Sequence, residues 1–324
     1  MGTPKVISFY VFTPLADPEA VRVWQLHLAG SLGLRGRVLL SIHGINATLG
    51  GDITVLKRYV HGLREYPSFR RARIAWSTGR ALDDGVTTAL FPRLSVKVRE
   101  EIVTFGAIDE LEVGEDGVVG GGTHLSPHEL DALVASEPDV VLLDGRNGIE
   151  HDVGRFRGAI RADVETTREF VGLIESGAWD HLKQSPVVTY CTGGIRCEIL
   201  TPLLRRRGFE QVYQLDGGIA AYGQTFGDTS LWEGSMYVFD ARTTVEFSPD
   251  AAVVGRCDRC SAATRRVVDC SEGACVRQMV RCEPCTAVEH GCDEHAARAN
   301  EPGALEGYSS AQTVPSSGTV PSTR

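Results

Sequence analysis

A cysteine followed by two glycines and an arginine is the pattern in this chain that most clearly predicts chemistry. The segment reads Val187-Val-Thr-Tyr-Cys-Thr-Gly-Gly-Ile-Arg-Cys197 and predicts a buried strand, a tight loop and a helix start. Backbone N–H groups in such a loop and at a helix start carry partial positive charge and point toward an anion. Together with the charge of Arg196 they lower a thiol pKa. We therefore expect Cys191 to be a thiolate and a nucleophile.

The length of the loop distinguishes between uses of that thiolate. The cysteine and the arginine are separated by four residues, Thr192, Gly193, Gly194 and Ile195. Cysteine phosphatases have five residues there, and the smaller ring of amides suits one sulfur or oxygen atom better than a phosphate. The loop resembles the rhodanese active-site loop, whose cysteine carries a persulfide. A buried, inert cysteine is the alternative, which the two glycines and the arginine disfavour. Cys197 is either a resolving thiol or a packed helix cysteine.

Three charged residues lie at or just after the end of a neighbouring predicted strand over residues 140–144. Buried strands over 140–144, 187–190 and 211–215 alternate with helical patterns, which predicts a parallel sheet covered by helices. Ligands bind beyond the carboxyl ends of the strands in such sheets. Asp144, Arg146 and Glu150 are therefore expected to brace the loop of Cys191, in a structural role, because a paired carboxylate and guanidinium occupy each other.

A cysteine-rich segment opens near Cys257, with seven thiols in 36 positions. Two C-x2-C pairs separated by 21 residues match a structural four-thiolate zinc site, with ligands Cys257, Cys260, Cys282 and Cys285. A second site is expected from the other thiols together with a histidine, namely Cys270, Cys275 and Cys292. Disulfides are the alternative, and they do not suit an intracellular protein.

The first 106 residues predict a different kind of fold. Strands are expected over 6–12, 37–42, 72–76 and 94–98, with a turn and a short strand over 44–51, and helices over 18–32 and from Asp52 to about 66. This order is typical of a ferredoxin-like or acylphosphatase-like domain.

Charge is unevenly distributed along the chain. The net charge is -9, but residues 1–106 hold 14 Lys and Arg against 8 Asp and Glu. Arginines neutralise phosphate and aromatic rings stack on bases, so an RNA-binding face is one explanation, and a solvated helix end beside core aromatics such as Tyr66, Phe69 and Trp76 is the other. The candidate RNA-binding residues are Arg64, Arg70, Arg71, Arg73, Lys97 and Arg99.

Length and composition set the remaining limits. The 324 residues predict two or three domains, and 42% hydrophobic and 23% charged residues are typical of a soluble globular protein. No apolar run is long enough for a membrane span and no export signal is recognisable, so we expect a cytoplasmic protein. The expected division is a basic ferredoxin-like domain over 1–106, a glycine-rich linker over 107–123, a parallel α/β domain over 124–226, a cysteine-rich segment over 227–295 and a disordered tail over 296–324.

The chain up to about residue 295 resembles one family, the rhodanese-domain tRNA uridine hydroxylases. The resemblance lies in Phe9-Tyr-Val-Phe-Thr-Pro14, Gly44-Ile-Asn46, the segment from Phe91 to Phe105, Cys191 to Glu198, Gln214 to Ile219, Leu231 to Asp240 and the cysteine cluster. It implies oxygen-dependent hydroxylation of the wobble uridine to 5-hydroxyuridine in the tRNA anticodon loop. It also implies molecular oxygen as co-substrate and Cys191 as the essential, persulfide-type cysteine. From the charge of the loop itself, we expect Arg196 to act with Cys191 as a catalytic residue.

Two other functions remain open at the level of sequence. A sulfurtransferase would use the same loop to pass sulfane sulfur from a thiosulfate-like donor to a carrier or to tRNA. A zinc-stabilised RNA-binding module with a vestigial rhodanese domain is disfavoured by the intact loop. The sequence carries no nucleotide-cofactor motif, and it identifies neither a protein partner nor an electron donor.

Overall fold

The first domain is an antiparallel sheet with two helices on one face. The computed structural model describes residues 2–79, 90–272, 274–288 and 291–295; the expected tail over 296–324 lies outside them. The elements of this domain are β1 (Pro4–Phe12), α1 (Pro18–Ser31), β2 (Arg35–Ser41), β3 (Gly44–Asp52), α2 (Ile53–Leu63), η1 (Pro67–Phe69), β4 (Ala75–Thr78) and β5 (Leu94–Val98). The sheet order is β4-β1-β3-β2-β5, which is the expected ferredoxin-like arrangement with β5 added parallel to β2.

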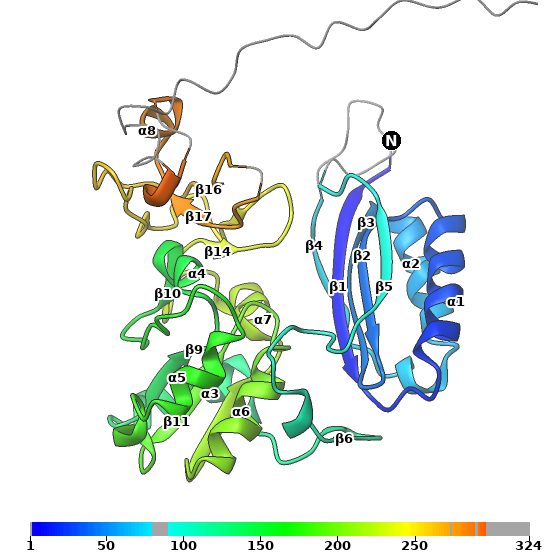
Figure 1. The fold of residues 1–324 in the computed structure, drawn as a ribbon, viewed down its shortest axis with the longest axis horizontal. Helices are drawn as coiled ribbons and strands as arrows, with labels where there is room; N and C mark the ends of the chain where they lie inside the picture. The colour runs from blue at the N-terminus through cyan, green and yellow to red at the C-terminus, as the bar shows by residue number, and fades with distance from the viewer. Residues whose placement is uncertain (1, 80–89, 273, 289–290, 296–324) are drawn as a thin grey trace, which may run out of the picture.

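Side-chain alternation along β1 and β3 gives this sheet two different faces. Ile7, Phe9 and Ile45 point into the core beneath α1 and α2, where the Phe9 ring lies 6.3 Å from that of Tyr59. Their neighbours in sequence, such as Tyr10, point to the opposite face. The helices cover only one side of the sheet, and the other side turns toward the second domain (Figure 1).

The second domain is a parallel sheet buried between helices. Its elements are β8 (Thr123–Leu125), α3 (Pro127–Ser136), β9 (Val141–Asp144), α4 (Gly148–Val153), β10 (Gly154–Phe156), α5 (Glu169–Glu175), η3 (Asp180–Leu182), β11 (Pro186–Tyr190), α6 (Cys197–Arg206), β12 (Gln211–Leu215) and α7 (Gly218–Phe226). The strand order is β8-β12-β11-β9, all parallel. Val187 packs with α5 and α6 on one face, and Val188 packs with α3 and α7 on the other. The continuous apolar run therefore marks a strand buried on both faces, as expected.

The segment between the two domains is folded. It contains η2 (Ile108–Glu110) and a small hairpin of β6 (Val113–Gly114) and β7 (Gly117–Val118). Val113 and Val118 pack against the core of the second domain, and Glu110 forms an ion pair with Arg207 at 2.7 Å. The glycine-rich stretch expected to link the domains is thus held against the second of them.

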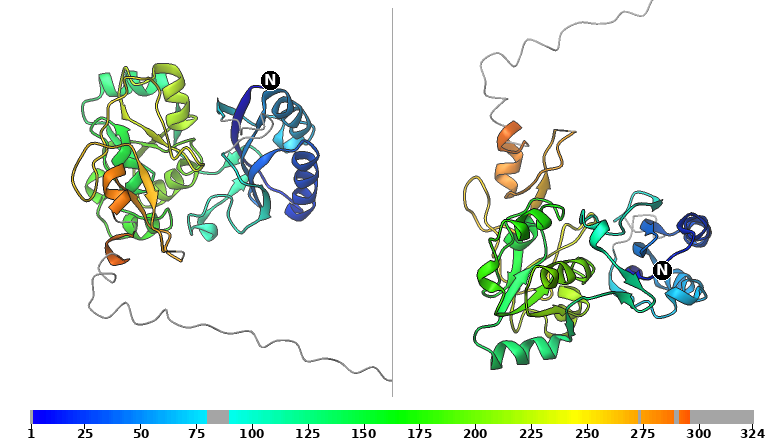
Figure 2. Two further views of the ribbon diagram at one scale, coloured as in Figure 1. Left: turned by 90° about the horizontal axis from the view of Figure 1, so that it is seen from above. Right: turned by 60° about the horizontal axis from the view of Figure 1, so that its bottom comes forward.

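The C-terminal part has short strands and little apolar core. Its elements are β13 (Trp232–Gly234), β14 (Met236–Tyr237), β15 (Thr244–Val245), β16 (Val267–Asp269), β17 (Gln278–Val280) and α8 (Glu283–Val288). β13 pairs with β10 of the second domain, and β16 with β17. Two views at other angles show this part at one end of the parallel-sheet domain (Figure 2). None of the helices in the described residues is long and apolar enough to cross a membrane.

Candidate active site

The loop that carries Cys191 lies between the end of β11 and the start of α6, as the sequence predicted. Gly194 has φ +97°, which favours glycine, and its N–H donates to Cys191 Sγ at 3.1 Å. Gly193 has no such requirement, because a Cβ there would meet no atom within 4 Å. The turn of the loop around the sulfur therefore depends on the second glycine.

The environment of Cys191 lowers its pKa. Burial of the thiol acts in the opposite direction and raises the pKa. It is outweighed by a hydrogen bond from the Cys197 thiol, by the charge of Arg196, and by the backbone N–H groups of Arg196 and Cys197, so that the pKa falls from 9.0 to about 5. Burial and the neighbouring thiolate raise the pKa of Cys197 well above its usual value. At neutral pH the pair is a thiolate that accepts a hydrogen bond from a thiol.

The guanidinium of Arg196 is held by Glu150 from α4. The two groups form a bidentate pair at 2.5 and 2.8 Å, and both side chains are buried. Thr192 Oγ1 accepts from Arg196 Nη2 at 3.1 Å and donates to Glu150 at 3.3 Å. Among the three bracing residues expected from the sequence, Glu150 contacts the loop directly.

Asp144 and Arg146 lie beneath the loop in a second buried pair. Arg146 donates to both carboxylate oxygens at 2.8 and 2.6 Å, and to the carbonyl of Gly154 at 2.6 Å. The Tyr190 hydroxyl donates to the same carboxylate at 2.9 Å. Burial raises the pKa of Asp144, but Arg146 and a hydrogen bond from His151 outweigh it and lower the pKa to about 2. This pair fixes the end of β11, from which the loop departs.

The start of α7 supports the loop from below, a contact that the sequence analysis missed. The N–H groups of Ile219 and Ala220 donate to the carbonyls of Cys191 and Thr192 at 2.9 and 3.0 Å. Gly218 has φ +63°, and a Cβ there would lie 2.4 Å from the Cys191 carbonyl oxygen. The glycine pair after β12 was the available clue, because it marks a close backbone approach at the same sheet edge.

Tyr10 of the first domain also reaches the loop, and the sequence analysis did not place it there. Its hydroxyl donates to Glu198 at 3.0 Å and would lie 2.8 Å from a Cβ on Gly194. His124 lies 3.8 Å from the Glu198 carboxylate. Burial is the largest cause that raises the pKa values of Tyr10 and of Glu198. Two protonatable groups therefore stand beside the thiolate, one from each domain.

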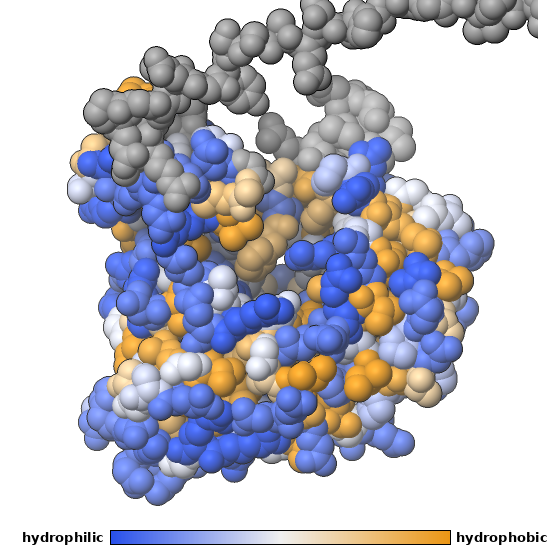
Figure 3. Space-filling model, viewed as in Figure 1, coloured by the Kyte–Doolittle hydropathy of each residue, from blue (hydrophilic) through white to orange (hydrophobic). Residues whose placement is uncertain are grey.

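The two domains enclose a cleft of about 2180 Å³, and Cys191 lies at its floor, fully buried. The domains touch through Arg73 and Asp216, and Arg242 of the C-terminal part donates to the carbonyl of Thr78 in the first domain at 2.8 Å. A space-filling view shows the molecule hollowed between them (Figure 3). The wall from the first domain carries a set of arginines, Arg37, Arg70, Arg71, Arg73 and Arg93.

Three of the six basic residues singled out from the sequence line this interdomain cleft, namely Arg70, Arg71 and Arg73. The other three lie outside its lining, namely Arg64, Lys97 and Arg99. The guanidinium groups of Arg70 and Arg71 form no hydrogen bond or ion pair with any described residue, and the same holds for the two arginines that the sequence analysis missed, Arg37 and Arg93. Of the aromatics near them, Phe69 is buried and stacks with Tyr66 at 4.7 Å, so these two serve the core.

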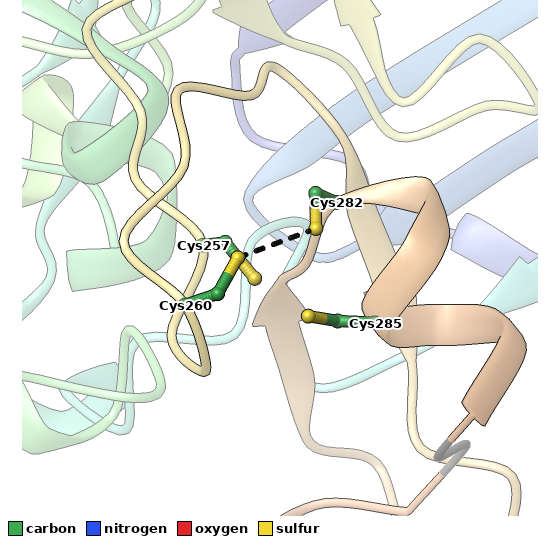
Figure 4. A group of neighbouring side chains, drawn as sticks. All are labelled: Cys257, Cys260, Cys282 and Cys285. Carbon is green, nitrogen blue, oxygen red and sulfur yellow. Dashed lines mark hydrogen bonds between the residues drawn. The ribbon is translucent and has the colours of Figure 1, made fainter.

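The two C-x2-C pairs converge in the C-terminal part. The Sγ atoms of Cys257, Cys260, Cys282 and Cys285 lie within 4.8 Å of one another. Cys260 and Cys282 are 3.6 Å apart (Figure 4). Tetrahedral thiolates at a Zn–S distance of about 2.3 Å would be about 3.8 Å apart, so the arrangement fits zinc, and none of the nine cysteines is in a disulfide.

A second group of ligands forms beside the first, and the histidine expected there is His295. Its Nδ1 atom lies 3.3 Å from Cys270 Sγ and 3.2 Å from Cys292 Sγ. Cys275 Sγ lies 4.0 Å from Cys292 Sγ, and the four ligand atoms are within 4.8 Å of one another. Three thiols and one imidazole match a closed structural zinc site.

Matches to three family models agree with this architecture. The sequence matches the family model for a UPF0176 acylphosphatase-like domain over residues 4–102, that for a rhodanese-like domain over 126–225 and that for a rhodanese C-terminal region over 233–297. A solved structure of the rhodanese-like domain of an Anabaena protein is 25% identical, with a TM-score of 0.29, over 44% of this chain and 98% of that one.

The curated relatives match over nearly their full length. The tRNA uridine(34) hydroxylase of Rhodococcus opacus is 58% identical over 287 residues, which cover 88% of this chain and 98% of that protein. The tRNA uridine(34) hydroxylase of Kocuria rhizophila is 57% identical over 287 residues, or 88% of this chain and 95% of that protein. This identity extends over all three structural regions, and the chain belongs to the tRNA uridine(34) hydroxylase family.

Proposed function

We propose that this protein is a tRNA hydroxylase that converts uridine 34 to 5-hydroxyuridine, with Cys191 as its nucleophile. The observation that carries the proposal is a buried cysteine whose pKa is lowered to about 5, at the floor of a cleft with a basic wall. A thiolate held by backbone N–H groups suits covalent catalysis on an electrophilic ring carbon. The family name supports the substrate and the reaction.

The thiolate activates the ring by addition. In uridine, C5 and C6 share a conjugated double bond, and C5 reacts poorly with oxygen. Attack by Cys191 forms an S–C6 bond and moves the electron pair to C5 and O4, as an enolate. Molecular oxygen, reduced with two electrons and two protons from an external donor, then supplies one oxygen atom to C5 and leaves the other as water. Loss of the C5 proton and of the thiolate restores the double bond.

The residues around the loop have distinct roles in this scheme. The Gly194 N–H stabilises the thiolate before attack and after elimination. Arg196, fixed by Glu150, supplies positive charge at the loop. Glu198, which accepts a hydrogen bond from Tyr10, is placed to accept the C5 proton, and burial raises its pKa and so strengthens it as a base. Asp144 and Arg146 act as positioning residues.

The cleft accommodates the anticodon loop in this proposal. Uridine 34 lies in a single-stranded loop, so turning it into a pocket has a small energetic cost. The arginines on the first-domain wall face the flanking phosphates, and unpaired guanidinium groups are free to bind them.

Two expectations from the sequence stay predictions. One is a cytoplasmic location, where tRNA is used, and the other is the set of domain boundaries.

Structural zinc holds the C-terminal part together in this proposal. Its two clusters of four ligands lie within a part of the chain that has short strands and little apolar core. Small domains of this kind depend on metals or disulfides for stability. The two clusters take no part in the hydroxylation in this proposal, because closed four-ligand sites leave no position for substrate.

Nucleoside mass spectrometry tests the proposal. Cells that lack the gene are supplied with the wild-type protein or with Cys191→Ser, and their tRNA is digested. We expect a uridine heavier by one oxygen atom at position 34 with the wild type only. Recovery with the serine variant would exclude the thiolate mechanism. A thiolated base in place of the hydroxylated one would establish sulfurtransfer, the second function that a rhodanese-type loop supports.

The attack on C6 has its own test. A tRNA with 5-fluorouridine at position 34 is incubated with the protein, and we expect a covalent adduct that maps to the peptide of Cys191. Cys197→Ser is the matched control, because it keeps the hydrogen-bond donor next to the nucleophile and retains the adduct. Absence of any adduct with an active wild-type protein would refute addition at C6.

A further inference from the structure

An exposed aromatic ring stands in the cleft and belongs to no hydrophobic core. Phe239 is 57% exposed and is the sole large apolar side chain among the described residues that is both exposed and part of the cleft lining. Other exposed apolar side chains, such as Ile42 and Val276, lie outside the cleft. A phenyl ring that is exposed in a cleft offers apolar surface that a bound ligand can cover.

The backbone around Phe239 holds the ring in place. The ring meets that of Tyr237 edge to face, with centroids 5.1 Å apart, and the Tyr237 hydroxyl donates to Gln278 at 2.9 Å. Val238 N–H donates to the carbonyl of Thr243 at 2.8 Å and closes the turn that bears Phe239. The turn connects β14 to β15. The ring is therefore exposed on a turn that is fixed by hydrogen bonds.

One contact places this turn next to the loop of the reacting thiolate, and a second joins it to the first domain. The guanidinium carbon of Arg196 lies 5.7 Å from the centroid of the Phe239 ring. Arg196 is the last residue of the loop before α6, and its guanidinium is fixed by Glu150. From the same turn, Arg242 donates to the first domain at the carbonyl of Thr78. The turn thus contacts the Cys191 loop through Phe239 and the first domain through Arg242.

We propose that Phe239 is the stacking platform for the target uracil and holds its C6 toward Cys191. This inference rests on the proposed function. An unstacked base loses its neighbours when it leaves the anticodon loop, and a flat aromatic ring replaces them. Stacking needs the face of a π system and no hydrogen bond, so Phe serves as well as a polar aromatic. The arginines of the opposite wall then meet the backbone phosphates on either side of the base.

Photocrosslinking tests the contact without relying on activity. A tRNA with 5-iodouridine at position 34 is bound to Cys191→Ser, which cannot remove the iodine, and is irradiated. Cleavage of the C–I bond leaves a C5 radical that adds to a stacked ring, and the ring hydrogen leaves with the iodine as HI. We expect the crosslink on the peptide of Phe239. Iodouridine at position 33, or Cys191→Ser with Phe239→Leu, should give no crosslink there, and a crosslink that persists after Phe239→Leu would refute the contact.

Kinetics separate stacking from simple packing. Phe239→Ala and Phe239→Leu should each lower kcat/KM for tRNA about 10- to 100-fold, the range expected when one base stack is removed, whereas Phe239→Trp should retain activity. Ile42→Ala removes an equally exposed apolar side chain outside the cleft and should leave kcat/KM unchanged. Wild-type rates in Phe239→Leu would refute the inference alone, and a wild-type protein without hydroxylation would refute the proposed function instead.

Discussion

At Cys191 two physical effects act in opposite directions on one thiol. Burial disfavours the thiolate, while donors from Gly194, Arg196 and Cys197 favour it and prevail. The largest of these effects come from the side chains of Cys197 and Arg196, and backbone N–H groups add to them. Arg196 contributes its charge while its guanidinium forms a bidentate pair with Glu150. The chemistry at this site therefore depends on how the chain is folded within a few residues.

The lowered pKa predicts a pH profile for alkylation. A pKa of about 5 means that the thiolate is the main form above pH 5 and is lost as the pH falls through that value. The rate of iodoacetamide reaction at Cys191, followed by peptide mass spectrometry, should be level from pH 8 to 6 and fall below 5. Cys197→Ala should shift the midpoint upward, and Cys197→Ser should shift it less. A wild-type midpoint near 9 would contradict this prediction.

At the scale of elements, three neighbours position the loop. The end of β11 is fixed by Asp144 and Tyr190, the start of α7 donates to the loop carbonyls, and α4 supplies Glu150. All three contacts lie at the carboxyl ends of the parallel strands. The loop consequently has little freedom, and its two glycines differ in what they do.

The two glycines give a matched pair of variants. Gly194→Ala forces an alanine into φ +97° and places its Cβ 2.8 Å from the Tyr10 hydroxyl, which should lower the free energy of unfolding by about 1–2 kcal/mol. It should also raise the pKa of Cys191 by displacing the N–H of residue 194. Gly193→Ala meets open space and should change stability by less than about 0.5 kcal/mol. Urea unfolding measures both, and equal effects would contradict the assignment.

Metal content tests the two cysteine clusters. We expect about two zinc ions per chain by elemental analysis, one for each closed four-ligand site. Cys285→Ser and His295→Ala should each remove one zinc and lower the thermal stability of the C-terminal part. Ser271→Ala, next to Cys270 and exposed, is the control and should retain both ions. Unchanged zinc in Cys285→Ser would rule out that cluster as the site.

At the scale of the whole molecule, the cleft combines unlike halves. One domain provides a thiolate at a sheet edge, and the other provides the open face of its sheet with a row of arginines. The excess of basic residues in 1–106 over the acidic remainder of the chain is therefore located partly on this arginine wall. Phosphates would be drawn to one wall and the base presented to the other.

Charge reversal on the arginine wall should weaken tRNA binding. Arg70→Glu with Arg71→Glu alters two unpaired cleft residues, and Arg64→Glu reverses a charge outside the cleft lining. The double variant should raise Kd at least tenfold and reduce the salt dependence of log K by about 0.7–0.9 for each phosphate that is no longer neutralised. Arg64→Glu should do neither. Filter binding over a salt series measures both quantities. Equal effects of the two variants would contradict the assignment of the RNA-binding face to the cleft.

Local sequence determined much of this protein. The strand, loop and helix around Cys191, the fold of both domains and the two cysteine clusters follow from patterns within short windows, because periodicity, turn residues and C-x2-C spacing act over a few residues. The thiolate followed for the same reason, since its main donors lie within six residues of it. Tyr66 and Phe69 were undecided, because an aromatic beside arginines suits a core or an RNA face equally.

Only the tertiary structure decided what surrounds the thiolate from afar. Tyr10 meets Glu198 across 188 positions of sequence, and Phe239 meets Arg196 from a turn beyond the second domain. No periodicity or spacing encodes such contacts, because they arise when separate domains pack and bring distant side chains to one cleft. The sequence by itself predicted the thiolate of Cys191 and the two groups of metal-type ligands. The packing of the domains decided which distant residues line the cleft beside them.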